Sequence, residues 1–226
     1  MNIRNQRGMT LLELAVVLLV LIGLAGVAMP YLAGKSQAVA CQTTDASLAA
    51  IRDVIMGSGA APGYLGDVGD LPRHPTAPAG SGYSLHYLFA DWDISDADCL
   101  PPNDPSNANC DRYQAFKPTT RRGWHGPYLL NGSTLNETTG ELGIRDMFLA
   151  RGAIVLQIPC NNGNSNEICD AGEARMADYA RLVSSGPDGA LDTTEADLNA
   201  ANRNDDRVLF LRRPDPKSDG NQACER

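Results

Sequence analysis

An apolar run over residues 9–29, preceded by a short leader with Arg4 and Arg7, constrains this chain more than any other feature. At about 1.5 Å per residue, a helix over this run is about 31 Å long, enough to cross a hydrocarbon core of about 30 Å. Its single charged residue is Glu13. Because a carboxylate costs about 2.5–3.5 kcal/mol at the centre of a membrane helix and less near its end, the sequence predicts a membrane-spanning helix in which Glu13 has a partner of opposite charge.

The residues around Glu13 form a recognisable N-terminal motif. Gly8 is followed by Met-Thr-Leu-Leu-Glu-Leu, which puts Glu13 five residues after the glycine and Pro30 22 residues after it. This pattern resembles the N-terminus of type IV pilins and type II secretion pseudopilins, although that family more often has Phe in place of Met9.

The resemblance implies a route of processing and assembly. A prepilin peptidase would cut the Gly8–Met9 bond and methylate the new amino group of Met9. The helix would then pack in the centre of a filament, with Glu13 offsetting the positive N-terminus of a neighbouring subunit. The expected partners are therefore the peptidase, the inner membrane, and copies of the chain itself or related pilin-like subunits.

Three other interpretations of the N-terminus are open. An ordinary secretory signal peptide needs a small-x-small cleavage site directly after the apolar run, where residues 30–32 are Pro-Tyr-Leu. A lipoprotein signal would end at Cys41, but the polar residues 35–37 separate this cysteine from the run. A plain signal anchor is the third. None of the three explains Glu13.

The distribution of charge predicts on which side of the membrane the rest of the chain lies. Among 226 residues the formal net charge is −8, and removal of Arg4 and Arg7 with the leader makes it −10. Basic residues before the span favour a cytoplasmic N-terminus. Together with the resemblance, this predicts a single-pass inner-membrane protein with a periplasmic domain, which enters a filament on assembly. An acidic domain repels phosphate backbones, so no nucleic-acid partner is expected.

Six cysteines fit a domain on the oxidising side of a membrane. They do not have the spacing of a zinc site, and six cysteines allow 15 pairings. Cys99 with Cys110 and Cys160 with Cys169 each bracket a short polar loop, which favours two local disulfides. Cys41 and Cys224 then pair by elimination.

The predicted fold class is α+β, with a long N-terminal helix packed against an antiparallel β-sheet as in pilins. Leu48, Ile51 and Ile55 extend an apolar stripe at helical spacing as far as Gly57. After the leader, residues 1–8, we therefore expect a transmembrane half over 9–29, an amphipathic half over 30–56 and a globular domain over 57–226. Residues 60–82 are predicted to be a loop, and residues 83–88 a strand or short helix. About four strands are predicted, at 147–149, 153–158, 179–183 and 208–211.

Two later segments resemble the major type II pseudopilin. Residues 122–129 are similar to its aromatic-Gly-Pro-Tyr-Leu segment, and the rings of Trp124 and Tyr128 are expected to pack in the core. Residues 182–198 are similar to its calcium loop. That resemblance implies Asp188 and Asp197 as calcium ligands, with Asp192 as a third carboxylate in a loop rich in the oxygens that calcium prefers. A solvated acidic turn without calcium is the alternative.

The sequence shows no nucleophile–base pair and no phosphate-cradling loop, so we expect a structural protein and not an enzyme. The expected function is that of a subunit of a type II secretion pseudopilus. A type IV pilus subunit has the same kind of N-terminal helix and is the first alternative. A membrane-anchored binding module that does not polymerise is an alternative of another class.

Overall fold

The computed structural model describes residues 11–59, 61–74, 82–90, 116–130, 133–135, 142–148, 152–161, 169–170 and 173–216, without the side chains of residues 27–35. The chain divides into two compact units, Met1–Val39 and Ala40–Arg226. Helix α1 (Leu11–Met56) contributes to both units. Each unit is described separately below.

The first unit contains the N-terminal part of α1. Every residue from 11 to 26 is exposed, including Leu11, Leu19 and Ile22, which expose 88%, 74% and 72% of their surface. Glu13 lies in the first turn of the helix. The predicted helix over the apolar run is confirmed from Leu11 onward, whereas Gly8 and Met9 lie outside the described residues. No helix in the described part of the chain is long and apolar enough to cross a membrane.

In the second unit the same helix becomes amphipathic. Leu48, Ile51 and Ile55 expose 2% or less of their surface and form one face, as their spacing predicts. The helix ends at Met56 because Gly57 takes a backbone φ of +87°, and its N–H donates to the carbonyl of Asp53 at 2.8 Å. A Cβ atom at Gly57 would lie 2.6 Å from the carbonyl oxygen of Ala61, so the predicted stop at this glycine is confirmed and has a steric basis.

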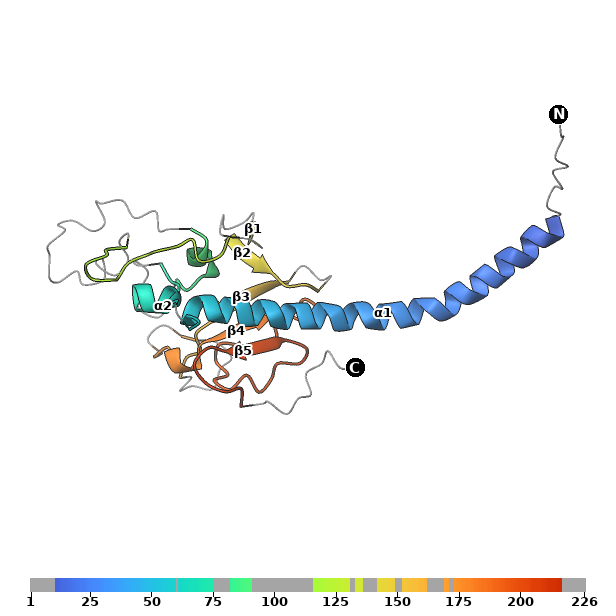
Figure 1. The fold of residues 1–226 in the computed structure, drawn as a ribbon. Helices are drawn as coiled ribbons and strands as arrows, with labels where there is room; N and C mark the ends of the chain where they lie inside the picture. The colour runs from blue at the N-terminus through green and yellow to red at the C-terminus, as the bar shows by residue number, and fades with distance from the viewer. Residues whose placement is uncertain are drawn as a thin grey trace, which may run out of the picture. The chain divides into compact units, whose positions relative to one another are not determined.

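The α+β fold is confirmed, with a five-stranded antiparallel sheet (Figure 1). The strands follow one another in sequence order as β1 (Ser133–Leu135), β2 (Leu142–Arg145), β3 (Ala153–Gln157), β4 (Arg181–Ser184) and β5 (Arg207–Phe210). In the register, Leu156 pairs with Leu182 and Leu182 with Leu209. The predictions at 153–158, 179–183 and 208–211 are confirmed as β3, β4 and β5, with ends that differ by no more than two residues.

The strand predicted at 147–149 was wrong at Met147 and Phe148, and residue 149 lies outside the described residues. Met147 and Phe148 lie in a bend that follows β2, where the carboxylate of Asp146 accepts the N–H of Phe148 at 3.2 Å. The strands β1 and β2 precede this bend and were not predicted. One further expectation needs correction, since the loop predicted over 60–82 contains helix α2 (Gly63–Val68). The strand or short helix predicted at 83–88 is a short helix, the 3₁₀ helix η1 (Leu85–Leu88). A second 3₁₀ helix, η2 (Ala177–Tyr179), precedes β4.

Both faces of the sheet are covered around β4. On one face the main core joins the buried side of α1 to α2, η1 and the strands β2 to β4. On the other face a smaller cluster forms under the loop between β4 and β5 and contains Val183, Ala200, Val208 and Phe210. This two-sided cover explains why all four residues of β4 are buried. Burying each large aliphatic side chain contributes about 1.5–3 kcal/mol, so α1 is a structural part of the second unit.

The described cysteines agree with the disulfide prediction. Cys160 and Cys169 form a disulfide with a Cα–Cα distance of 5.7 Å. Cys41 is 3% exposed on α1 and is also disulfide-bonded. Cys99, Cys110 and Cys224 lie outside the described residues, so the other two predicted pairs remain predictions.

Candidate metal centre

The loop between β4 and β5 brings three carboxylates together. Oxygen atoms of Asp188, Asp192 and Asp205 all lie within 4.8 Å of one another. Asp188 is exposed, whereas Asp192 and Asp205 are half-buried. Because like charges at this distance disfavour one another, a divalent cation or another positive group would stabilise the ionised cluster.

The backbone of the loop explains why residues 17 positions apart meet. Gly186 has a φ of +65°, and a Cβ atom there would lie 2.3 Å from the carbonyl oxygen of Asp205. Only glycine allows this approach of the two ends of the loop. The N–H of Asp188 then donates to the carboxylate of Asp205 at 3.0 Å, while Asp188 itself accepts the N–H of Ala190 at 2.8 Å.

A buried carboxylate lies directly after Asp205. Asp206 is 2% exposed, and one of its oxygens accepts the N–H of Thr193 at 2.6 Å. Its other oxygen, Oδ1, has no hydrogen-bond donor among the described residues. Burial raises the pKa of Asp206, and the negative charge of Asp192 raises it further. A buried carboxylate oxygen without a donor, on the residue that directly follows Asp205, is consistent with an oxygen-rich cation site.

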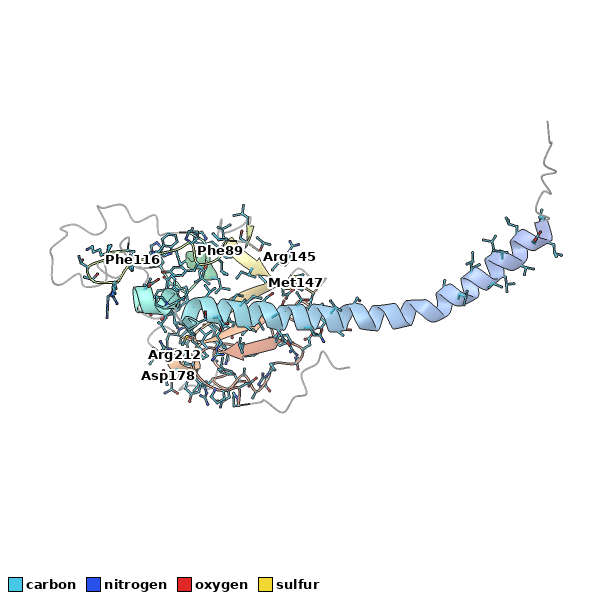
Figure 2. All side chains as sticks on the ribbon, in the orientation of Figure 1. Phe89, Phe116, Arg145, Met147, Asp178 and Arg212 are labelled. Atoms are coloured by element: carbon cyan, nitrogen blue, oxygen red, sulfur yellow. A yellow bond between two sulfur atoms is a disulfide. The ribbon has the colours of Figure 1, made fainter. Side chains whose placement is uncertain are left out.

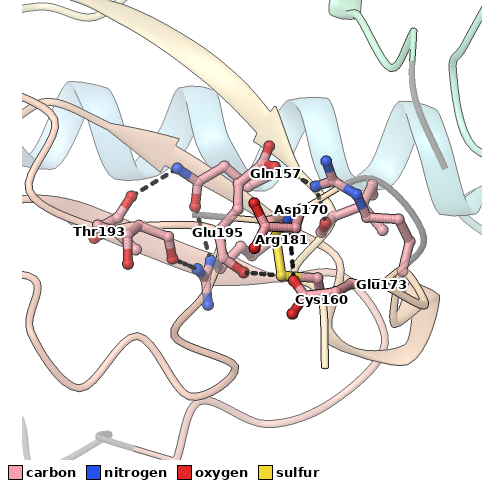
Figure 3. A network of polar contacts seen from close by, with 11 residues as sticks. Gln157, Cys160, Asp170, Glu173, Arg181, Thr193 and Glu195 are labelled. Carbon is pink, nitrogen blue, oxygen red and sulfur yellow. Dashed lines mark hydrogen bonds and ion pairs between the residues drawn. A yellow bond between two sulfur atoms is a disulfide. The ribbon is translucent and has the colours of Figure 1, made fainter. Parts of the chain in front are cut away.

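The inner part of the loop is held by a buried arginine (Figure 3). Arg181 on β4 is fully buried, and its guanidinium donates to the carbonyls of Thr194 at 2.7 Å, Asp197 at 2.6 Å and Leu198 at 3.3 Å. Its Nε donates to the side chain of Gln157 at 3.0 Å. Burial lowers the pKa of Arg181 to about 10. These four bonds fix the backbone from Thr194 to Leu198 against the sheet.

The same part of the loop is tied to the disulfide segment. The N–H of Cys160 donates to the carbonyl of Glu195 at 3.1 Å, and the carboxylate of Glu195 pairs with Arg175. Gln157 donates its side-chain N–H to the carbonyl of Thr193 at 2.7 Å (Figure 3). The loop that carries the carboxylates therefore has one side, from 193 to 198, that is hydrogen-bonded to the sheet and the disulfide segment, and one exposed side, from 188 to 191.

Of the three predicted calcium ligands, the structure brings Asp188 and Asp192 together and adds Asp205. Asp197 is outside this group. Its two carboxylate oxygens accept the N–H groups of Asn199, Ala201 and Asn202 at 2.6–3.1 Å, so it shapes the following turn. Asp205 has a signal in the sequence that we did not use. It stands just before β5, and the start of β5 faces the end of β4, which Asp188 follows.

No protein family, curated protein or solved structure compared with the chain matches it.

The donor set fits calcium better than a softer metal. Three carboxylates can supply several of the six to eight oxygens that calcium takes, and the cluster contains neither the sulfur nor the nitrogen ligands that zinc prefers. A second group of possible ligands, Cys160, Cys169 and Glu173, is different because its two sulfur atoms are already joined in the disulfide. Asp188, Asp192 and Asp205 are therefore the candidate metal centre.

Proposed function

We propose that this protein is a structural subunit of a pilin-like filament, and that the filament is the pseudopilus of a type II secretion system. One observation carries the proposal. The N-terminal part of α1 exposes apolar side chains in every direction from Leu11 to Gly26, with Glu13 as its single charged residue, while the same helix continues into the core of an α+β unit.

The exposed apolar surface calls for apolar surroundings. Soluble proteins rarely expose contiguous apolar patches larger than a few hundred Å². Burying a Leu, Val or Ile side chain contributes about 1.5–3 kcal/mol, and the run from Leu11 to Leu24 is composed almost wholly of such residues. We infer that lipid covers this helix before assembly and that the helices of neighbouring subunits cover it afterwards.

The membrane topology is part of the same proposal. The span would cover residues 9–29, although Met9 and the side chains after Gly26 lie outside the described residues. Arg4 and Arg7 would keep the N-terminus in the cytoplasm, and the second unit would lie in the periplasm. The disulfide between Cys160 and Cys169 is consistent with an oxidising compartment.

Glu13 would act in assembly. After cleavage of the Gly8–Met9 bond, the new amino group of Met9 would lie one helical turn from the Glu13 carboxylate, on its own helix or on a neighbour's. In a medium of low dielectric constant such a pair is far stronger than in water. Glu13 would thus select subunits whose leaders have been removed.

Calcium is the proposed cofactor. When bound at Asp188, Asp192 and Asp205 it would neutralise the three charges and join the two ends of the loop between β4 and β5. Asp197, which the sequence also pointed to, would then contribute through the turn that it shapes and not as a ligand.

The proposal is tested in cells that also express a prepilin peptidase. Intact-mass spectrometry should show that residues 1–8 are lost and that Met9 is N-methylated, and Gly8→Arg should leave the leader in place. Glu13→Ala should leave membrane insertion and the melting temperature unchanged but remove filaments, whereas the control Thr10→Ala should keep them. An uncut leader would contradict the processing step. Normal filaments with Glu13→Ala would contradict its assembly role, and no filaments from the wild type would favour the membrane-anchored binding module.

The kind of filament requires a separate measurement. In the source cell, deletion of the gene should abolish secretion of folded exoproteins into the medium if the filament is a secretion pseudopilus. Loss of surface pili with normal secretion would instead identify a type IV pilus subunit.

A further inference from the structure

A positively charged hairpin stands out on this acidic chain. Residues 116–124 fold back on themselves, with the N–H of Phe116 donating to the carbonyl of Trp124 at 3.0 Å and the N–H of Lys117 to that of Arg122 at 2.9 Å. The turn between them contains Lys117, Arg121 and Arg122, all exposed, and no carboxylate. The chain as a whole has a formal net charge of −8.

Two arginines of this turn are available to a partner. Among the described residues neither Arg121 nor Arg122 forms an ion pair. Arg121 also has a backbone φ of +52°, in the left-handed region that favours Gly or Asn. An arginine at a position that suits glycine indicates that its side chain has a use.

The hairpin is held firmly at its base. The N–H of Gly123 donates to the carbonyl of Asp67 on α2 at 2.9 Å, and the hydroxyl of Tyr128 donates to the Asp67 carboxylate at 2.9 Å. The ring of Phe116, which is labelled in Figure 2, stacks on the ring of His125 with the two centroids 4.3 Å apart. Both arginines therefore belong to a hairpin whose base is firmly held, which lowers the entropy cost of binding.

We propose that this hairpin is a contact surface for a second copy of the chain, and that it binds the acidic loop that contains Asp188, Asp192 and Asp205. The argument is charge complementarity. The loop presents three carboxylates within 4.8 Å of one another, and the hairpin presents planar cations that match carboxylates in geometry. Copies of a chain with this net charge repel one another unless cationic and acidic surfaces meet.

Calcium and a neighbouring hairpin are alternative ways to neutralise the same carboxylates. Calcium should therefore weaken the contact between subunits. Salt should weaken it too, because the arginines of the hairpin and Asp188 of the loop are exposed. This inference rests on the proposed function, because it assumes that copies of the chain assemble with one another. It adds which surfaces of the second unit meet.

The test uses the full-length chain in membranes, with chelator present. A photo-reactive amino acid replaces Thr119, which is exposed at the tip of the hairpin. Illumination should give a crosslinked dimer whose attachment point, mapped by mass spectrometry, lies within residues 186–205. Replacing Arg121 and Arg122 by Glu should lower the dimer yield by about fivefold or more, the scale expected for a close charge pair.

Matched variants separate charge from folding. Replacing Arg121 and Arg122 by Lys should keep most of the yield, and Arg145→Glu, at an exposed arginine on β2, should not change it. Replacing Asp188 and Asp192 by Lys should lower the dimer yield about as much as replacing Arg121 and Arg122 by Glu. Combining these two charge reversals in one chain should restore the yield.

Two outcomes would overturn the proposal. One is a dimer yield that does not respond to the charge reversals, and the other is crosslinking to lipid, to nucleic acid or to another part of the chain. Filaments that form while the crosslink maps elsewhere would refute this contact and leave the proposed function intact. A crosslink to the acidic loop in cells that form no filaments would support this contact and contradict the proposed function.

Discussion

Replacing Arg181 by Met tests whether one buried side chain holds the loop that carries the candidate metal centre. Arg181 makes four hydrogen bonds, three to backbone carbonyls of residues 194–198 and one to Gln157. Hydrogen bonds to charged groups contribute about 1.5–3 kcal/mol each, which sets an upper bound of about 6–12 kcal/mol. Burying a guanidinium costs several kcal/mol, and Met avoids that cost. The expected net loss of folding free energy is about 3 kcal/mol.

The expected loss can be measured as a change in melting temperature. For a domain of this size about 1 kcal/mol corresponds to 2–4 °C, so Arg181→Met should melt about 6–12 °C below the wild type. The assay is tryptophan fluorescence of the full-length protein in detergent, since Trp124 is partly buried against the core. Arg181→Lys keeps a charge but lacks the planar set of donors, so its melting temperature should be intermediate.

A matched control is available at the surface. Arg212 pairs with Asp178 at 3.4 Å, and the side chain of Asp178 is 85% exposed (Figure 2). Exposed pairs contribute little, so Arg212→Met should change the melting temperature by less than about 2 °C. If Arg181→Met also melted within about 2 °C of the wild type, the guanidinium would not be what holds the loop, and the reasoning from its four hydrogen bonds would be wrong.

Three further predictions concern calcium, pH and the disulfide. Calcium at a hundred times its Kd should stabilise the wild type by about 2.7 kcal/mol relative to chelator. Asp205→Ala should abolish the difference in melting temperature between calcium and chelator, whereas the control Asp178→Ala should keep it. Identical melting curves of the wild type in calcium and in chelator would exclude calcium binding. Burial raises the pKa of Asp146, so the folded state takes up its proton more readily than the unfolded state, and this residue's contribution to stability falls as pH rises through the raised pKa. The melting temperature of the wild type minus that of Asp146→Asn should therefore fall as the pH rises above the ordinary Asp pKa of about 4, and a constant difference would contradict the raised pKa. Cys160→Ser should lower the free energy of unfolding by about 2–4 kcal/mol. If reductant lowers the stability of the wild type by a similar amount but does not affect this variant, the loss belongs to the Cys160–Cys169 bond. An unchanged melting temperature of Cys160→Ser would count against a stabilising role of this disulfide.

The parts of the fold that the sequence predicted are those with strong local signals. Gly57 ends α1 through its own backbone conformation, and Ile154, Leu182 and Val208 lie in strands rich in β-branched or aliphatic residues. The strands β1 and β2 have no such signal. They are three and four residues long, and Gly143 stands inside β2. Their position depends on tertiary contacts such as the bond from the N–H of Leu142 to Nδ1 of His86, which no local pattern encodes.

The candidate site shows the same division between local and distant information. Asp188 and Asp192 belong to one acidic stretch and could be found from its composition. Asp205 lies outside that stretch and could be found only by pairing the strands predicted at 179–183 and 208–211. Its close approach to Asp188 also needs the contact at Gly186, which no local pattern encodes. The role of Asp197 could not be assigned either, since its bonds to three backbone N–H groups follow from the conformation of the turn.

The pairing of the first helix with the last strand has a consequence for the time course of folding. Arg207 at the start of β5 forms an ion pair with Asp45 on α1, and Arg52 donates to the carbonyl of Leu211 at 3.1 Å, so residues about 160 positions apart in the sequence hold each other. During synthesis at about 5–20 residues per second, β5 leaves the ribosome roughly 8–30 s after α1. For that interval Leu48, Ile51 and Ile55 lack part of their cover, so the core of the second unit cannot be completed until the last strand has been made.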